Sequence, residues 1–247
     1  MSESNYLLAI EDLTVSFDGF KAVDGLNFYM DRNELRVIIG PNGAGKTTVL
    51  DLICGKTRAT DGSIKFKNRE LLGMAEHKIV HSGVGRKFQT PSIYENLTVF
   101  ENLELSYPGG HTVFGTLAFR RTPEVIARIE SVAESVYLKE MLEIEGAFLS
   151  HGQKQWLEIG MLLMQDPELL MLDEPVAGMS PAEREATAEL LKRICENRSI
   201  LIIEHDMEFV QRIAHKVTVL HLGKILAEGS MTEIQQNERV QDVYLGH

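Results

Sequence analysis

Short runs of apolar and β-branched residues recur along the chain and predict a set of buried strands. LRVIIG at residues 35–40 ends in glycine, and TTVLDLICG follows it with apolar residues at helical spacing until Gly55. Three later runs have the same character and are separated by helical stretches: ELLMLDE (168–174), SILIIEH (199–205) and KVTVLHL (216–222). This alternation of strands and helices predicts an α/β core with a parallel sheet.

Two other regions depart from this pattern. Residues 7–30 contain short β-type runs broken by Asp-Gly pairs, which predict antiparallel strands and turns. Residues 90–165 have a helical pattern, in which Thr122 and Pro123 suit an N-cap and first turn, with helical spacing at Val125, Ile129, Val132 and Val136. We expect one domain over residues 1–247: an α/β core with an antiparallel β subdomain at 1–89 and 166–247, and a helical subdomain at 90–165. Within the helical subdomain, the sequence of residues 105–121 predicts only an irregular connection.

Composition narrows the classes of protein that fit. Of the 247 residues, 44% are hydrophobic, which is enough for a sizeable core. The net charge of −11 argues against non-specific nucleic-acid binding, since that affinity comes from clustered Lys and Arg. The only cysteines, Cys54 and Cys195, have no paired spacing, so we expect neither disulfides nor zinc, and a reducing setting fits. No apolar run approaches the roughly 18 residues of a membrane span, so we expect a soluble chain, with docking on a membrane protein left open.

The segment GPNGAGKT at residues 40–47 fits G-x-x-x-x-G-K-[ST] between a predicted strand and a predicted helix. Gly40, Gly43 and Gly45 allow the backbone to wrap so that successive N–H groups point at phosphate oxygens. The helix start adds about half a positive charge. Lys46 supplies a full charge for the β- and γ-phosphates, and Thr47 supplies a hydroxyl for Mg²⁺. The segment therefore predicts a nucleoside triphosphate site.

Polar side chains follow two predicted strands at the sheet edge where ligands bind in open α/β folds. Asp173 is the candidate Mg²⁺ ligand, and Glu174 is the candidate acceptor of a proton from the attacking water. We expect His205, after the next strand, to reach the γ-phosphate and hold that water and Glu174 in register. Gln89 is a candidate for contact with Mg²⁺ and for sensing the nucleotide, although on sequence alone an exposed polar residue explains it better.

A second helix start, LSHGQ at residues 149–153, is rich in hydrogen-bonding groups. A plain N-cap explains Ser150 alone, whereas a nucleotide on another subunit explains Ser150, Gly152 and Gln153 together. We therefore expect the helix over 152–164 to face a γ-phosphate across a subunit interface. The plain N-cap remains the alternative.

Taken in order, GPNGAGKTT, Gln89, LSHGQ, LLMLDE and His205 resemble the nucleotide-binding subunit of ABC transporters over essentially the whole chain. The resemblance implies the P-loop NTPase fold of that family and an Mg²⁺-dependent ATPase that closes head to tail around two ATP molecules. It assigns catalytic roles to Lys46, Gln89, Glu174 and His205, and metal contacts to Thr47, Gln89 and Asp173. The ATP-binding residues that it implies are Phe17, which stacks on adenine, and Gly40, Asn42, Gly43, Ala44, Gly45, Lys46, Thr47, Thr48, Ser150, Gly152 and Gln153.

Two positions depart from the family's pattern. His151 replaces the third residue of the usual LSGGQ, where its imidazole is expected to add contacts to the opposing nucleotide rather than act as a base. Ser180 stands where the family usually has an aspartate that crosses the dimer. Because Ser180, Pro181 and Glu183 together form a predicted capping box, helix initiation accounts for Ser180.

The details of LSHGQ, the EPVAGM turn and the ending VYLG look like the importer branch for branched-chain amino acids and urea. Residues 84–105 and 149–179 are similar in detail to the urea importer's ATP-binding subunit. This resemblance implies urea or a similar small amide as cargo, with branched-chain amino acids or amides as the alternative. It also implies a second ATPase subunit (a related partner or a second copy), two transmembrane permease subunits, a periplasmic substrate-binding protein, a docking groove near 89–103, and a peripheral position on the cytoplasmic face of a bacterial membrane.

Two hypotheses from other classes remain. An ABC ATPase that acts on DNA or ribosomes usually carries a long coiled-coil insertion or two cassettes, and this acidic chain predicts neither. A nucleotide sensor that does not hydrolyse ATP conflicts with the presence of Glu174 and His205.

Overall fold

The computed structural model describes residues 6–87, 92–108 and 121–245. The chain divides into two compact units. The first consists of Met1–Arg86, Glu168–Glu174 and Leu191–His247, and the second of Lys87–Pro167 and Pro175–Leu190.

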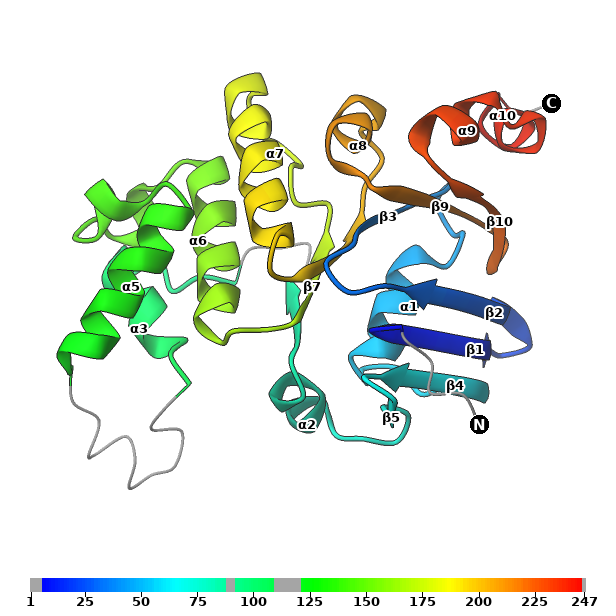
Figure 1. The fold of residues 1–247 in the computed structure, drawn as a ribbon, viewed down its shortest axis with the longest axis horizontal. Helices are drawn as coiled ribbons and strands as arrows, with labels where there is room; N and C mark the ends of the chain where they lie inside the picture. The colour runs from blue at the N-terminus through cyan, green and yellow to red at the C-terminus, as the bar shows by residue number, and fades with distance from the viewer. Residues whose placement is uncertain (1–5, 88–91, 109–120, 246–247) are drawn as a thin grey trace. The chain divides into compact units, whose positions relative to one another are not determined.

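Two sheets form the framework of the first unit (Figure 1). The smaller is antiparallel, in the order β2-β1-β4-β5, and the larger has the order β10-β9-β3-β8-β7-β6. Within the larger sheet β7, β8, β3 and β9 run parallel, and β10 is antiparallel to β9. The bounds are β1 Leu8–Phe17, β2 Phe20–Met30, β3 Leu35–Ile39, β4 Asp61–Phe66, β5 Arg69–Glu70, β6 Val84–Lys87, β7 Leu169–Asp173, β8 Ser199–Ile203, β9 Lys216–His221 and β10 Lys224–Gly229.

Every residue of β3, β7 and β8 is buried, which explains why these strands are mainly apolar. Their register pairs Ile38 with Ile203 and Asp173 with Ile203, so the three strands end together. The residues that follow each strand therefore meet at one edge of the sheet.

The helices of the first unit are α1 Lys46–Ile53, α2 Glu76–His81, α8 Met207–Ile213, α9 Met231–Gln236 and α10 Glu238–Leu245. A single apolar cluster joins α1 with strands of both sheets. Helix α1 ends before Gly55, whose φ of +79° stops the helix as predicted.

The second unit is helical and contains α3 Val99–Leu105, α5 Pro123–Ser135, two short 3₁₀ turns and α6 His151–Met164 (Figure 1). Helix α7, Pro181–Cys195, begins in this unit and ends in the first. Thr122 caps α5 as predicted, since its side chain accepts a hydrogen bond from Val125 N. In the part of the chain that the structure describes, no helix is long and apolar enough to cross a membrane. The two sheets and the helical unit confirm the predicted fold class.

One detail of the sequence prediction is wrong. Asp18-Gly19 forms the turn between β1 and β2, but Asp24-Gly25 lies inside β2 and breaks no strand. Gly25 has φ +63°, and the pairing with β1 shifts register beside it, between Leu13 and Val15. The second Asp-Gly therefore makes a bulge, where a residue with positive φ is favoured. Most of the connection predicted at 105–121 lies outside the described residues.

Candidate nucleotide-binding and catalytic site

The loop between β3 and α1 is shaped by glycines in conformations that other residues rarely adopt. Gly40 has φ +153° and Gly45 has φ +100°. A Cβ at Gly40 would lie 2.2 Å from Leu220 O, and one at Gly45 would lie 2.4 Å from Ala22 O. Two independent causes, the backbone angle and the close approach of another strand, therefore require glycine at both positions.

The ammonium group of Lys46 lies within this loop. Lys46 Nζ donates to Gly40 O at 2.8 Å and to Pro41 O at 3.1 Å. Burial lowers the pKa of Lys46, while the nearby charges of Glu174 and Asp173 oppose that shift. The loop thus holds the positive charge of Lys46 at its own carbonyl groups, next to the start of α1. Backbone N–H groups and the helix dipole at this helix start also favour the binding of an anion. Asn42 and Gly43 are exposed in the same loop, whereas Ala44 is buried.

Two oxygen donors for a metal lie side by side at the start of α1 and the end of β7. Thr47 Oγ1 lies 3.4 Å from Asp173 Oδ2, and Asp173 is buried. Among the described residues, no group of three or more His, Cys, Asp and Glu forms a metal site. Mg²⁺ commonly uses one or two protein oxygens and completes its shell with phosphate and water. The hydroxyl and carboxylate therefore fit an Mg²⁺ ion that arrives with a nucleotide.

The residues after β7 and β8 form the next part of the site. His205 Nδ1 lies 3.4 Å from Glu174 Oε1. Glu174 has φ +47°, in the left-handed region, and its N–H donates to Ile203 O at 2.9 Å. Such a conformation costs a non-glycine residue on the order of 1–3 kcal/mol and is concentrated at functional sites. The side chain of His205 is 68% exposed, so its imidazole can reach a bound ligand.

Glu204 is a residue of this region that the sequence analysis missed. Its buried carboxylate accepts hydrogen bonds from His205 N at 3.0 Å and Asp206 N at 3.3 Å. It therefore fixes the backbone from which His205 projects. The available signal was an acidic residue at the end of the otherwise apolar run SILII.

The predicted adenine-stacking residue, Phe17, lies at the end of β1 and is 49% exposed. It is paired across the hairpin with Phe20. Ala22, in β2 of the same hairpin, approaches the loop at Gly45. The hairpin that carries Phe17 therefore packs against the phosphate loop.

The LSHGQ segment belongs to the second unit, where it starts α6. Ser150 Oγ accepts from Gln153 N at 3.2 Å, and Gln153 Oε1 accepts from Ser150 N at 2.8 Å. This is a capping box, in which both side chains satisfy the helix start. The sequence argument that a cap explains only Ser150 is therefore wrong, because it also explains Gln153. His151 Nε2 lies 3.0 Å from Ala177 O in the same chain.

The structure thus groups the predicted residues in two sets. The phosphate loop, Asp173, Glu174 and His205 belong to the first unit, and Ser150, Gly152 and Gln153 to the second. Ser180 starts α7 with the predicted capping box, since Ser180 N donates to Glu183 Oε2 at 2.9 Å and Glu183 N donates to Ser180 Oγ at 3.3 Å. Gln89 lies outside the described residues.

Known proteins resemble this chain along its whole length. Residues 23–177 match the ABC transporter family, and residues 224–247 match a family described as branched-chain amino acid ATP-binding cassette transporter. The branched-chain amino acid transport ATP-binding protein BraF of Pseudomonas aeruginosa is 35% identical, over 98% of this chain and 99% of its own. LivG of Salmonella typhimurium, which carries the same description, is 36% identical over the same shares of the two chains.

Solved structures agree with these sequences. A nucleotide-free ATP-binding cassette from an ABC transporter has a TM-score of 0.86 and 28% identity, and the comparison covers 98% of this chain and all of the other. The ADP conformation of MJ1267, an ATP-binding cassette of an ABC transporter, has the same TM-score and identity, over 98% and 99% of the two chains. The fold is that of a nucleotide-binding cassette. The chain therefore belongs to the ABC transporter family as an ATP-binding subunit, a kind of protein that hydrolyses ATP in support of transport.

Proposed function

We propose that this chain is the ATP-hydrolysing subunit of an importer for branched-chain amino acids. The observation that supports this choice of cargo is the similarity to BraF and LivG, at 35–36% identity over 98% of the chain. The match of residues 224–247 to the branched-chain amino acid family also supports it. The comparisons therefore favour the alternative cargo of the sequence analysis over urea.

In this proposal, residues of the first unit bind and hydrolyse ATP. Lys46 and the N–H groups of its loop bind the phosphates, and Mg²⁺, when bound near Thr47 and Asp173, neutralises phosphate charge. Glu174 accepts a proton from the attacking water. His205, 3.4 Å from Glu174, orients that water and contacts the γ-phosphate.

The second half of each site comes from another ATPase subunit, either a related protein or a second copy. In this proposal Ser150, Gly152 and Gln153 of one subunit contact ATP held by the loop of the other. ATP closes the pair and hydrolysis reopens it. Two membrane permease subunits and a periplasmic substrate-binding protein complete the importer, which places this chain on the cytoplasmic face of the membrane.

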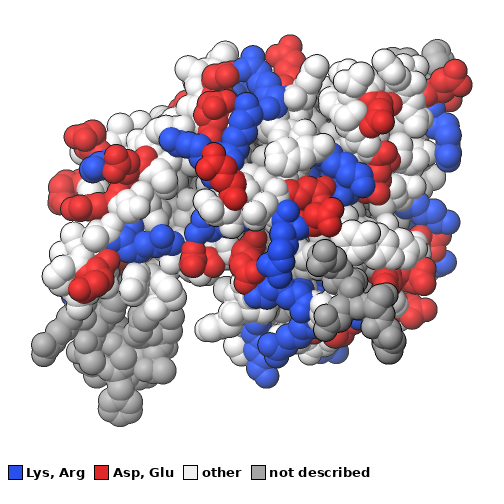
Figure 2. Space-filling view, in the orientation of Figure 1, with Lys and Arg blue, Asp and Glu red and all other residues white. Residues whose placement is uncertain are grey.

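The surface charge supports a role in transport rather than a role in nucleic-acid binding. The chain carries 36 acidic and 25 basic side chains. On the face drawn in Figure 2, Lys and Arg are interleaved with Asp and Glu. The longest helix of the described residues is the 15-residue α7, too short for the coiled-coil arm of ATPases that act on DNA. Clustered basic side chains, which nucleic-acid binding needs, do not dominate this face.

Purification with the membrane subunits tests the proposal. The complex, reconstituted in vesicles with its binding protein, is assayed for phosphate release with leucine, isoleucine, valine or urea. We expect the branched-chain amino acids to stimulate hydrolysis, and Glu174→Gln to abolish the stimulated rate. Stimulation by urea alone would overturn the cargo, and stimulation that survives Glu174→Gln would overturn the catalytic assignment.

A further inference from the structure

A carboxylate from α7 lies directly on the start of α6. Ser150 Oγ donates to Glu183 Oε1 at 2.9 Å. The other oxygen, Glu183 Oε2, accepts from Ser180 N at 2.9 Å and from Ser180 Oγ at 2.8 Å. A Cβ at Gly152 would lie 2.4 Å from Glu183 Oε1, so glycine at this position leaves room for the carboxylate. All of these residues belong to the second unit.

A serine hydroxyl has one proton to donate. Ser150 gives that proton to Glu183, while its oxygen accepts from Gln153 N. Ser150 therefore cannot donate to a phosphate oxygen while the bond to Glu183 persists. Any phosphate that binds here must take the place of the carboxylate.

The carboxylate also carries the wrong charge for a neighbouring phosphate. Hydrogen bonds from Ser180 and Ser150 hold the pKa of Glu183 below its ordinary value, so the group is ionised at neutral pH. Two anions that share one set of donors repel each other. Glu183 thus occupies the helix start in the same way as an anionic ligand would.

We propose that Glu183 is a positioning residue that competes with the nucleotide for Ser150. In the separate chain, Glu183 holds the Ser150 hydroxyl and its negative charge opposes phosphate. In the closed pair, the phosphate of the opposing ATP takes the Ser150 proton and displaces Glu183. The competition raises the ATP concentration at which the pair closes. This inference rests on the proposed function of LSHGQ.

The chain contains a matched control for this residue. Glu233 caps α9 with the same geometry: Ser230 N and Ser230 Oγ donate to Glu233 Oε2 at 2.7 and 2.8 Å, and Glu233 N donates to Ser230 Oγ at 3.3 Å. Glu233 belongs to the first unit and has no part in the LSHGQ segment. Glu233→Gln therefore reproduces the capping change of Glu183→Gln and leaves Ser150 untouched.

The assembled transporter is assayed for ATPase activity against ATP concentration in both variants. We expect Glu183→Gln to lower the ATP concentration for half-maximal rate by about two- to fivefold, the range of an exposed charge interaction, and Glu233→Gln to behave as wild type. The shift must shrink as salt screens the charge. Equal curves for the two variants, or a shift that salt does not change, would overturn the inference.

Two further measurements keep the result interpretable. If Glu183→Gln lowers the thermal midpoint more than Glu233→Gln, the comparison is repeated with Glu183→Ala and Glu233→Ala, and the same shift is expected. Ser150→Ala tests the proposed function itself. If it hydrolyses ATP at the wild-type rate, the proposed function fails, whereas loss of hydrolysis in Ser150→Ala with no shift in Glu183→Gln rejects only the competition.

Discussion

His205 Nδ1 lies 3.4 Å from Glu174 Oε1, and the two residues follow the adjacent parallel strands β8 and β7. This proximity predicts that both act on the same water molecule. Glu174→Gln keeps the shape of the side chain and removes the base, so ATP binding is expected to persist while turnover falls by about 10²-fold or more. His205→Ala is expected to reduce turnover without weakening ATP binding to the same extent. Phosphate release and nucleotide binding, measured on one sample, check both. Wild-type turnover in Glu174→Gln would contradict the assignment.

Phe17 and Phe20 face each other across the β1–β2 hairpin and are both exposed, at 49% and 63%. If Phe17 stacks on adenine, Phe17→Ala weakens ATP binding by about five- to 150-fold, because stacking of a base on an aromatic ring contributes about 1–3 kcal/mol. Phe20→Ala is the control, with a similar loss of exposed aromatic surface. If calorimetry gave equal ATP affinities for the two variants, Phe17 would not be part of the ATP-binding site.

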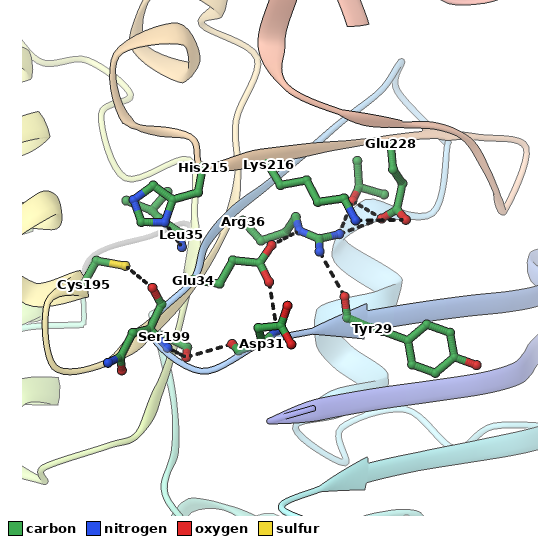
Figure 3. A network of polar contacts seen from close by, with 12 residues as sticks. Tyr29, Asp31, Glu34, Leu35, Arg36, Cys195, Ser199, His215, Lys216 and Glu228 are labelled. Atoms are coloured by element: carbon green, nitrogen blue, oxygen red, sulfur yellow. Dashed lines mark hydrogen bonds and ion pairs between the residues drawn. The ribbon is translucent and has the colours of Figure 1, made fainter. Parts of the chain in front are cut away.

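A buried ion network lies at the other end of β3 from the phosphate loop (Figure 3). Arg36, 1% exposed, pairs with Glu34 and Glu228 at 2.6 Å each. It also donates to Thr218 Oγ1 at 2.9 Å and to Tyr29 O at 3.0 Å. The guanidinium group thereby satisfies acceptors from several strands of the first unit.

Removal of Arg36 leaves these acceptors without their cation. Arg36→Ala is expected to destabilise the protein by about 3–5 kcal/mol, because the carboxylate of Glu34 becomes a buried, uncompensated charge. Lys216→Ala, which removes an exposed partner 3.7 Å from Glu228, is expected to cost less than about 1 kcal/mol. Denaturant unfolding compares the two. If the two variants lost similar free energies of unfolding, burial would not be what determines the strength of this network.

Glu168 provides a test of pH dependence. Lys67 and Arg32 pair with it, and these bonds hold the pKa of Glu168 below its ordinary value of 4.5. A lowered carboxyl pKa contributes stability above the ordinary value that is lost as the pH falls through the lowered one. Glu168→Gln is therefore expected to reduce stability at pH 7 by about 0.2–1 kcal/mol per pair. The difference from wild type should shrink below pH 4.5, and a difference independent of pH would refute this origin.

Local signals were sufficient for much of the core. The phosphate loop, the buried strands and the capped start of α5 each depend on residues close in sequence, such as Gly55 after α1 or Thr122 before α5. Strands β4 and β10 were not predicted. Strand β4 joins its sheet through pairs with β1, such as Leu8 with Phe66 and Thr14 with Asp61, which are contacts between distant segments.

The same distinction applies to the site. The residues of LSHGQ are contiguous and form a recognisable motif, but the partner of Ser150, Glu183, lies 33 positions away on another helix. Arg36 stands within the predicted strand LRVII, but its acceptors Thr218 and Glu228 come from later strands, so its ion pairs were not predicted. Charge partners that only tertiary structure brings together leave no pattern at helical or strand spacing.

The proposed mechanism requires ATP to be held between two subunits. The most direct test is trapping of radiolabelled ATP in the Mg²⁺-supplied transporter that carries Glu174→Gln, followed by gel filtration. We expect this complex to retain ATP, and the same complex with Ser150→Ala added to release it while binding to the phosphate loop persists at equilibrium. Equal retention with and without Ser150 would contradict the account.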